Sequence, residues 1–190
     1  AVVDKEHKAA AQALRKILAK YAEVELLVQI VHNAIAAKRR MLIFSQFVGM
    51  LQMIRKRLGR EGIQTLYLDG ETRPDKRQEL CDRFNGGEGR VFLISLKAGG
   101  TGLNLTGADL VIHYDPWWNP AAEDQATDRA HRIGQTHDVD VVKLIAQGTI
   151  EEKVTDLSKR KRAVFDRVVM AGETELRSLS EEDIRALFFS

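Results

Sequence analysis

A glutamine and two arginines lie at helical spacing in a segment, 120–133, that is predicted to be a helix. Residues three or four positions apart share a helix face, so Gln125, Arg129 and Arg132 are expected to project together. Two guanidinium groups at the end of a helix, just before Gly134, would form a compact cationic site. Ordinary surface salt bridges would explain an isolated pair of arginines, but this pair is also expected to lie at an edge of an α/β sheet with other polar loops.

A glycine-rich segment, 99–102, is the second candidate site. It does not fit the dinucleotide pattern Gly-x-Gly-x-x-Gly, because Leu105 occupies the position of the third glycine. The sequence also contains no Gly-Lys-Ser/Thr, so it carries no Walker-type phosphate loop. The backbone N–H groups of this turn, with Lys97 and the Thr101 hydroxyl, could hold a phosphate of a nucleic-acid strand. A plain structural turn is the alternative.

Polar loops follow four predicted strands, and open α/β sheets bind their ligands at the carboxyl ends of strands. These loops are 45–46, 69–73, 95–104 and 115–120. Each contains more glycine, hydroxyl and polar residues than a turn requires, which indicates a binding edge. No metal site is predicted, because His113, His131 and His137 lack the spacing of metal ligands.

The elements that must position these loops alternate along the chain. Helices are predicted from Tyr21 to about Lys38 and at 47–58, 72–84, 120–133 and 150–170, with residues 1–19 also helical in pattern. Strands are predicted at 41–44, 63–68, 90–94, 110–114 and 139–146. Thr72 is expected to be an N-cap, with Pro74 in the first turn and 85–87 as the stop. This alternation predicts a parallel sheet that is covered by helices on both faces.

The overall composition excludes several classes. The chain has 190 residues, of which 44% are hydrophobic and 29% charged, as in a globular protein with a core. Its net charge of +2 gives no general preference for a partner, and the basic run 159–162 is either a solvated helix face or a DNA-facing patch. The single cysteine, Cys81, excludes an internal disulfide framework and is expected to pack in the core. No apolar run is long enough to span a membrane.

Four segments in order resemble the motifs of one family. MLIFSQF at 41–47 is similar to motif IV, LDGET at 68–72 to the segment after it, SLKAGGTGLNL at 95–105 to motif V and DRAHRIGQ at 128–135 to motif VI. DPWWNP at 115–120 links the last two. Together these segments cover about residues 40–155. The chain thus resembles the C-terminal helicase-like domain of the SWI/SNF family of DNA-dependent ATPases, within helicase superfamily two.

The resemblance implies an α/β, RecA-like three-layer sandwich with a mostly parallel central sheet. The lobe would occupy 41–150, between an N-terminal helical segment at 1–40 and a C-terminal helical extension at 151–190. Such motors bind ATP and Mg²⁺ between two lobes, mainly through the first lobe, whose motifs do not occur in this sequence. Arg132 and Arg129 would reach the γ-phosphate as arginine fingers. The other residues implied to lie near the ATP are Gly102, Asn104, Gln125 and Gln135.

The same resemblance implies a grip on the DNA backbone. The residues expected to contact DNA are Ser45, Gln46, Arg73, Lys97, Gly100, Thr101 and Trp118. A buried anchor is the alternative for Trp118, and Trp117 is expected to pack in the core. Contacts to phosphates hold DNA without reading its sequence, which suits a motor that moves along any duplex.

The implied function is the second motor lobe of an ATP-dependent translocase on double-stranded DNA. The chain by itself is expected to hydrolyse no ATP. Its partners would be double-stranded DNA, the first RecA-like lobe of the same polypeptide and a protein target such as a DNA-bound complex, and no membrane. The location would be the cytoplasm and nucleoid in a bacterium, or the nucleus in a eukaryote. The alternative is a non-catalytic RecA-like module that binds DNA or protein. A third hypothesis, a free-standing enzyme acting on a nucleotide, is weakly supported because the sequence shows no acid–base pair or nucleophile.

Overall fold

The structure is a computed structural model that describes residues 2–99, 102–117, 120–130 and 138–145, with the single residues 152, 155, 156 and 159. It contains a five-stranded sheet in the order β2-β3-β1-β4-β5. The strands are β1 (Met41–Ser45), β2 (Thr65–Leu68), β3 (Val91–Ser95), β4 (Leu110–His113) and β5 (Asp140–Lys143). All neighbouring pairs are parallel, which confirms the predicted sheet.

The three central strands are apolar runs because both of their faces are covered. Every residue of β1, β3 and β4 is buried, as expected for parallel strands between two helical layers. Alternate side chains of β1 point to opposite faces, so that Phe44 and Ile43 belong to two separate hydrophobic clusters. The core therefore consists of two apolar layers, one on each side of the sheet.

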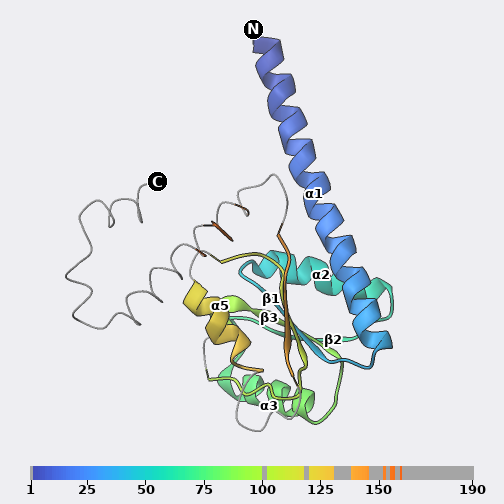
Figure 1. The fold of residues 1–190 in the computed structure, drawn as a ribbon, viewed down its shortest axis with the longest axis vertical. Helices are drawn as coiled ribbons and strands as arrows, with labels where there is room; N and C mark the ends of the chain where they lie inside the picture. The colour runs from blue at the N-terminus through green and yellow to red at the C-terminus, as the bar shows by residue number, and fades with distance from the viewer. Residues whose placement is uncertain are drawn as a thin grey trace, which may run out of the picture.

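Each layer has its own helices (Figure 1). On the face of Ile43 lie α1 (Val2–Ala36) and α2 (Val48–Arg60), which contribute Leu27 and Ile54 to the core. On the face of Phe44 lie α3 (Pro74–Asn85), α4 (Leu96–Gly99) and α5 (Pro120–Thr127). This arrangement confirms the α/β, RecA-like three-layer fold, and Figure 1 shows the N-terminal half of α1 extending beyond the sheet.

The start of α3 differs from the prediction. Its N-cap is Arg73 and not Thr72, and the Arg73 side chain makes no capping hydrogen bond. The Thr72 hydroxyl is engaged elsewhere, since it accepts from the backbone N of Asp69 (3.1 Å) and donates to the Asp69 carboxylate (3.2 Å). Pro74 occupies the first turn as predicted, and α3 ends at Asn85 with Gly87 at a φ of 97°.

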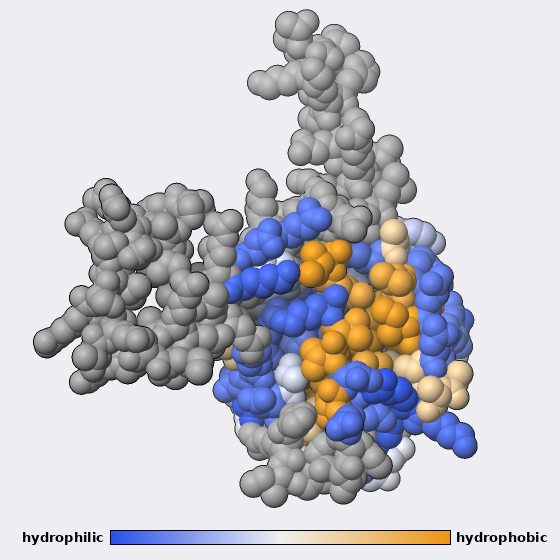
Figure 2. Space-filling view, in the orientation of Figure 1, coloured by the Kyte–Doolittle hydropathy of each residue, from blue (hydrophilic) through white to orange (hydrophobic). Residues whose placement is uncertain are grey.

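The two outer strands form the edges of the described sheet. β5 pairs with β4 alone among the residues that the structure describes, and most of its side chains are exposed. Val141 and Ile145 are 44% and 37% exposed. Figure 2 shows a continuous apolar area on the face of the molecule that is seen in Figure 1. The final helix predicted at 150–170 and the tail lie outside the described residues, apart from the four single positions.

Candidate functional site

The order of the strands creates a site for ligands at the carboxyl end of β1. The chain leaves β1 towards α2 on one face of the sheet, whereas it leaves the neighbouring strands β3 and β4 towards α4 and α5 on the other face. Outgoing loops that separate in this way mark the topological switch point of an α/β sheet. The predicted binding loops after β1, β3 and β4 therefore meet at one edge.

Asp115 ties the loop after β4 to the loop after β1. Asp115 is 4% exposed, and its carboxylate accepts hydrogen bonds from the Ser45 hydroxyl and from the backbone N of Gln46, the latter at 2.9 Å. The Gln46 side chain also donates to the Pro116 carbonyl, at 3.3 Å. Three hydrogen bonds thus join the two loops. Asp115 was not among the site residues predicted from the sequence. Its position directly after a buried strand was the available signal.

Glu123 holds the other side of the same loop. One of its carboxylate oxygens accepts from the backbone N of Trp117 at 2.7 Å, and the other forms an ion pair with Lys143 of β5. The Glu123 side chain is 3% exposed and that of Lys143 is 40% exposed. Trp117 packs partly buried against the core, as predicted. The loop therefore lies between two buried carboxylates.

His113, at the end of β4, is a packing residue. It is buried, its ring stacks on Phe44 with centroids 5.7 Å apart, and its Nε2 lies 3.0 Å from the Thr127 hydroxyl. Burial lowers its pKa to about 4, although the charge of nearby Glu123 acts in the opposite direction. The imidazole is therefore neutral near pH 7.

The arginine segment departs from the predicted helix. α5 ends at Thr127, and a turn follows at 128–130, in which the N–H groups of Arg129 and Ala130 bond three residues back. The Arg129 carbonyl accepts from the backbone N of Leu105 (2.9 Å), so it is engaged by another segment instead of by a further helical turn. Gln125 is exposed and Arg129 is 5% exposed, so these two do not share one open face. Arg132 and Gln135 lie outside the described residues.

The remaining nucleotide candidates lie on the chain between α4 and β4. Gly102 is exposed with a φ of 62°, a backbone conformation that favours glycine. Asn104 is exposed, and its carbonyl accepts a hydrogen bond from the Asn85 side chain at 2.9 Å. The bond from Leu105 to Arg129 places this segment beside the arginine segment.

The DNA candidates separate by exposure. Gln46 is half-buried, and Lys97 and Arg73 are exposed, with an Arg73 nitrogen 3.1 Å from the carboxylate of Asp75. Ser45 is buried and bonded to Asp115. Arg73 belongs to the loop that follows β2, and β3 lies between β2 and β1 in the sheet. Gly100, Thr101 and Trp118 lie outside the described residues.

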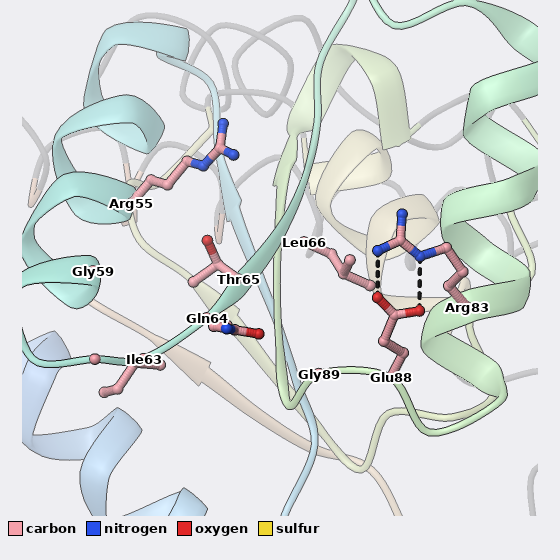
Figure 3. A pocket seen from close by; sticks show the side chains of 10 residues that line it. Arg55, Gly59, Ile63, Gln64, Thr65, Leu66, Arg83, Glu88 and Gly89 are labelled. Atoms are coloured by element: carbon pink, nitrogen blue, oxygen red, sulfur yellow. Dashed lines mark hydrogen bonds and ion pairs between the residues drawn. The ribbon is translucent and has the colours of Figure 1, made fainter.

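A hollow of about 530 Å³ lies away from this edge, beside the amino end of β2 (Figure 3). Arg83 and Glu88 pair with each other at its wall, and the exposed Arg55 also lines the hollow. Among the described residues no cluster of acidic, histidine or cysteine side chains could hold a metal ion. None of the helices in this part of the chain is long and apolar enough to cross a membrane.

The sequence is similar to those of several known proteins. A family model described as "Helicase conserved C-terminal domain" matches residues 22–134. An "Uncharacterized ATP-dependent helicase" of Mycoplasma pneumoniae is 39% identical over 173 residues, which are 90% of this chain and 17% of that protein. The "Putative ATP-dependent helicase/translocase YwqA" of Bacillus subtilis is 41% identical over 167 residues, 87% of this chain and 18% of that protein. The "Helicase swr1" of Aspergillus fumigatus is 42% identical over 151 residues, 79% of this chain and 9% of that protein.

A solved structure agrees with these matches. The "Crystal structure of the C-terminal part of Fun30 ATPase domain" superposes with a TM-score of 0.69 and 37% identity, over 72% of this chain and 45% of that one. The chain spans less than a fifth of the length of the three relatives above. Since the family model covers more than half of the chain, the chain belongs to the helicase conserved C-terminal domain family, of the type found in SWI/SNF ATP-dependent helicases.

Proposed function

We propose that this chain is the second motor lobe of a translocase on double-stranded DNA, which completes an ATP site on another lobe and grips the DNA backbone. The observation that carries this function is the direct joining of the family's loops at one edge. Asp115 joins the loop after β1 to the loop after β4, and that loop leads through α5 into the arginine segment. A movement of the loop after β1 on DNA would therefore be transmitted to the arginine segment through Asp115, the loop after β4 and α5.

Arg132 is the proposed arginine finger, and Arg129 is the second arginine. A planar guanidinium can bind two phosphate oxygens at once and supplies positive charge where the transition state develops negative charge. Because Arg129 is 5% exposed, it also belongs to the packing, and its substitution should lower stability as well as activity. Gly102, Asn104 and Gln125 are exposed and so are available to a nucleotide, and Gln135 is proposed to help orient the arginines. The first lobe would hold most of the ATP and its Mg²⁺.

The DNA grip is assigned to exposed side chains at the carboxyl edge. Lys97 and Arg73 carry the positive charge that phosphates require, and Gln46 can add a hydrogen bond. Ser45, whose hydroxyl is committed to Asp115, is assigned the positioning of Gln46 instead of a contact to DNA. Gly100, Thr101 and Trp118 complete the proposed set. The proposed partners are double-stranded DNA, the first lobe and a protein bound to DNA.

The decisive test of this function is Arg132→Ala in the full-length protein that carries this chain. DNA-stimulated ATP hydrolysis should fall about a thousandfold or more, because the finger acts mainly on the transition state. ATP binding, measured with a fluorescent nucleotide, should change little. Arg60→Ala, at an exposed position at the end of α2, is the control and should keep normal turnover. Turnover by Arg132→Ala near that of the unmodified protein would show that the finger is assigned wrongly.

A binding module without catalysis is the second candidate, because the sequence lacks a Walker phosphate loop. The two functions differ in one cheap observation. A catalytic motor needs a Gly-Lys-Thr and an Asp-Glu-x-His sequence in the polypeptide upstream of this lobe, and a binding module does not.

A further inference from the structure

Both tryptophans of this protein, Trp117 and Trp118, lie in the loop between β4 and α5. Two buried carboxylates hold the described part of this loop. Asp115 attaches it to the end of β1, through the Ser45 hydroxyl and the Gln46 backbone. Glu123 attaches it to β5, through the Trp117 backbone and Lys143. The loop is therefore held from both sides. Both attachments use side-chain carboxylates and not the backbone hydrogen bonds of a helix or a sheet.

Glu123 connects three elements with one side chain. It belongs to α5, it accepts from the loop at Trp117, and it pairs with Lys143 at the end of β5. Burial of a carboxylate is costly, and an apolar side chain would fill the same space at lower cost if packing were its only role. The carboxylate is also specific, because both of its oxygens accept and both of its partners donate. A glutamine of the same size has one acceptor, so it can satisfy only one of the two donors in either amide orientation.

We propose that Glu123 is a positioning residue that fixes the tryptophan loop against β5 and α5, so that this loop and the arginine segment after α5 move as one unit. The coupling to the arginines rests on the function proposed above, whereas the fixing of the loop does not. DNA bound at the loop would then set the position of Arg132 relative to the nucleotide. Without the carboxylate, the loop could still bind DNA, but a movement of the loop would shift the arginine segment by a smaller amount.

The fixing of the loop can be tested in the 190-residue protein, because its tryptophan fluorescence comes from this loop alone. Glu123→Gln should shift the emission maximum to longer wavelength and increase quenching by acrylamide, while the far-ultraviolet circular dichroism stays unchanged. The matched control is Glu79→Gln, which removes the carboxylate of an exposed ion pair with Lys76 on α3. Emission and quenching of Glu123→Gln equal to those of Glu79→Gln would overturn the proposal.

A second variant covers the case in which Glu123→Gln does not fold. Lys143→Met changes a side chain that is 40% exposed at the end of an edge strand, and it removes the cation while leaving the bond from Trp117 to Glu123. It should shift the emission in the same direction as Glu123→Gln, but by less. A fluorescence spectrum like that of the unmodified protein would then reject the role of the pair.

The coupling is tested in the full-length protein by the dependence of ATP hydrolysis on DNA. Glu123→Gln should lower the maximal stimulation of ATP hydrolysis by DNA and leave the KM for ATP without DNA unchanged. A general loss of structure would instead lower ATP hydrolysis both with and without DNA. A changed fluorescence with normal DNA stimulation would overturn the coupling and keep the fixing of the loop. Absence of any DNA stimulation in the unmodified protein would instead contradict the proposed function, so the two failures are distinguishable.

Discussion

His113 illustrates how its surroundings set the charge of a single residue. An ordinary histidine has a pKa near 6.5, whereas burial beside Phe44 lowers the pKa of His113 to about 4. As pH falls below about 6.5, the unfolded chain therefore binds a proton that the folded chain rejects until about pH 4. Protonation then favours the unfolded state, so stability is lost as pH decreases through this window.

The corresponding prediction concerns the free energy of unfolding at two pH values. Between pH 7 and pH 5 the unmodified protein should lose about 2 kcal/mol more than His113→Gln, since each unit of pKa shift corresponds to about 1.4 kcal/mol. Urea unfolding of both proteins at each pH measures this difference. The comparison between the two proteins cancels the carboxylates, which also titrate in this range. Parallel losses in the two proteins would show that His113 does not carry the effect.

Single residues were predictable where local pattern determines their environment. Cys81 lies in a helical stripe and is buried as predicted, and burial raises the pKa of its thiol to about 11. Asp115 and Glu123 were not assigned structural roles, because their partners at Gln46 and Lys143 are distant in sequence. Their roles depend on which strands are neighbours, and no local spacing encodes that order.

At the scale of elements, Asn85 joins the end of α3 to the segment before β4. Its side chain donates to the Asn104 carbonyl at 2.9 Å and accepts from the backbone N of Gly107 at 3.0 Å. The two segments approach so closely that a Cβ on Gly107 would lie 2.8 Å from an Arg40 nitrogen and 3.1 Å from the Asn85 Cα. Glycine is therefore favoured at 107 by the lack of space for a side chain and not by φ.

We accordingly expect Gly107→Ala to destabilise the protein by about 1–3 kcal/mol, the usual cost of overpacking a close contact. Thermal or urea unfolding measures the change. The control is Gly49→Ala in α2, where a Cβ would meet nothing within 4 Å, and alanine there should stabilise by about 0.5–1 kcal/mol because it favours the helix. Equal effects of the two substitutions would contradict the close approach at Gly107.

The elements themselves were predicted where apolar periodicity is strong, and their ends were predicted less well. All five strands and α2, α3 and α5 lie close to their expected positions. The errors have tertiary causes: the hydroxyl of Thr72 bonds to Asp69 instead of capping α3, and Leu105 engages the carbonyl of Arg129 beyond the end of α5. The single turn α4 was expected to be loop, and a bond from the Ala98 backbone to the Ser95 hydroxyl supports it.

At the scale of the whole molecule, the isolated chain is one part of a proposed two-part site. The division of the chain at residues 40 and 150 stays a prediction, and α1 shares its core with the sheet from Val24 to Ala34. The purified 190-residue protein should hydrolyse ATP no faster than background, with or without DNA, because its sequence has no Walker loop. Colorimetric release of phosphate measures this, and sustained turnover that survives repurification would contradict the proposed division of labour.

DNA binding by the whole lobe should depend steeply on salt, because phosphate contacts release counterions. Lys97→Ala should weaken binding to all duplex sequences alike and reduce the slope of log K against log salt by about one. Titrations of labelled duplexes at several salt concentrations measure the slope, with Lys56→Ala on α2 as the control. An unchanged slope would exclude Lys97 from the set of phosphate contacts.

The central position of β1 also affects how this protein emerges from a ribosome. Met41 pairs with Val91 on one side and Leu110 on the other, so the second neighbour of β1 is translated about 70 residues after it. At a synthesis rate of about 5–20 residues per second, the nascent apolar strand waits roughly 4–14 s for its second neighbour. We therefore expect translation speed and chaperone supply to influence the soluble yield of this lobe more than small changes in its final stability.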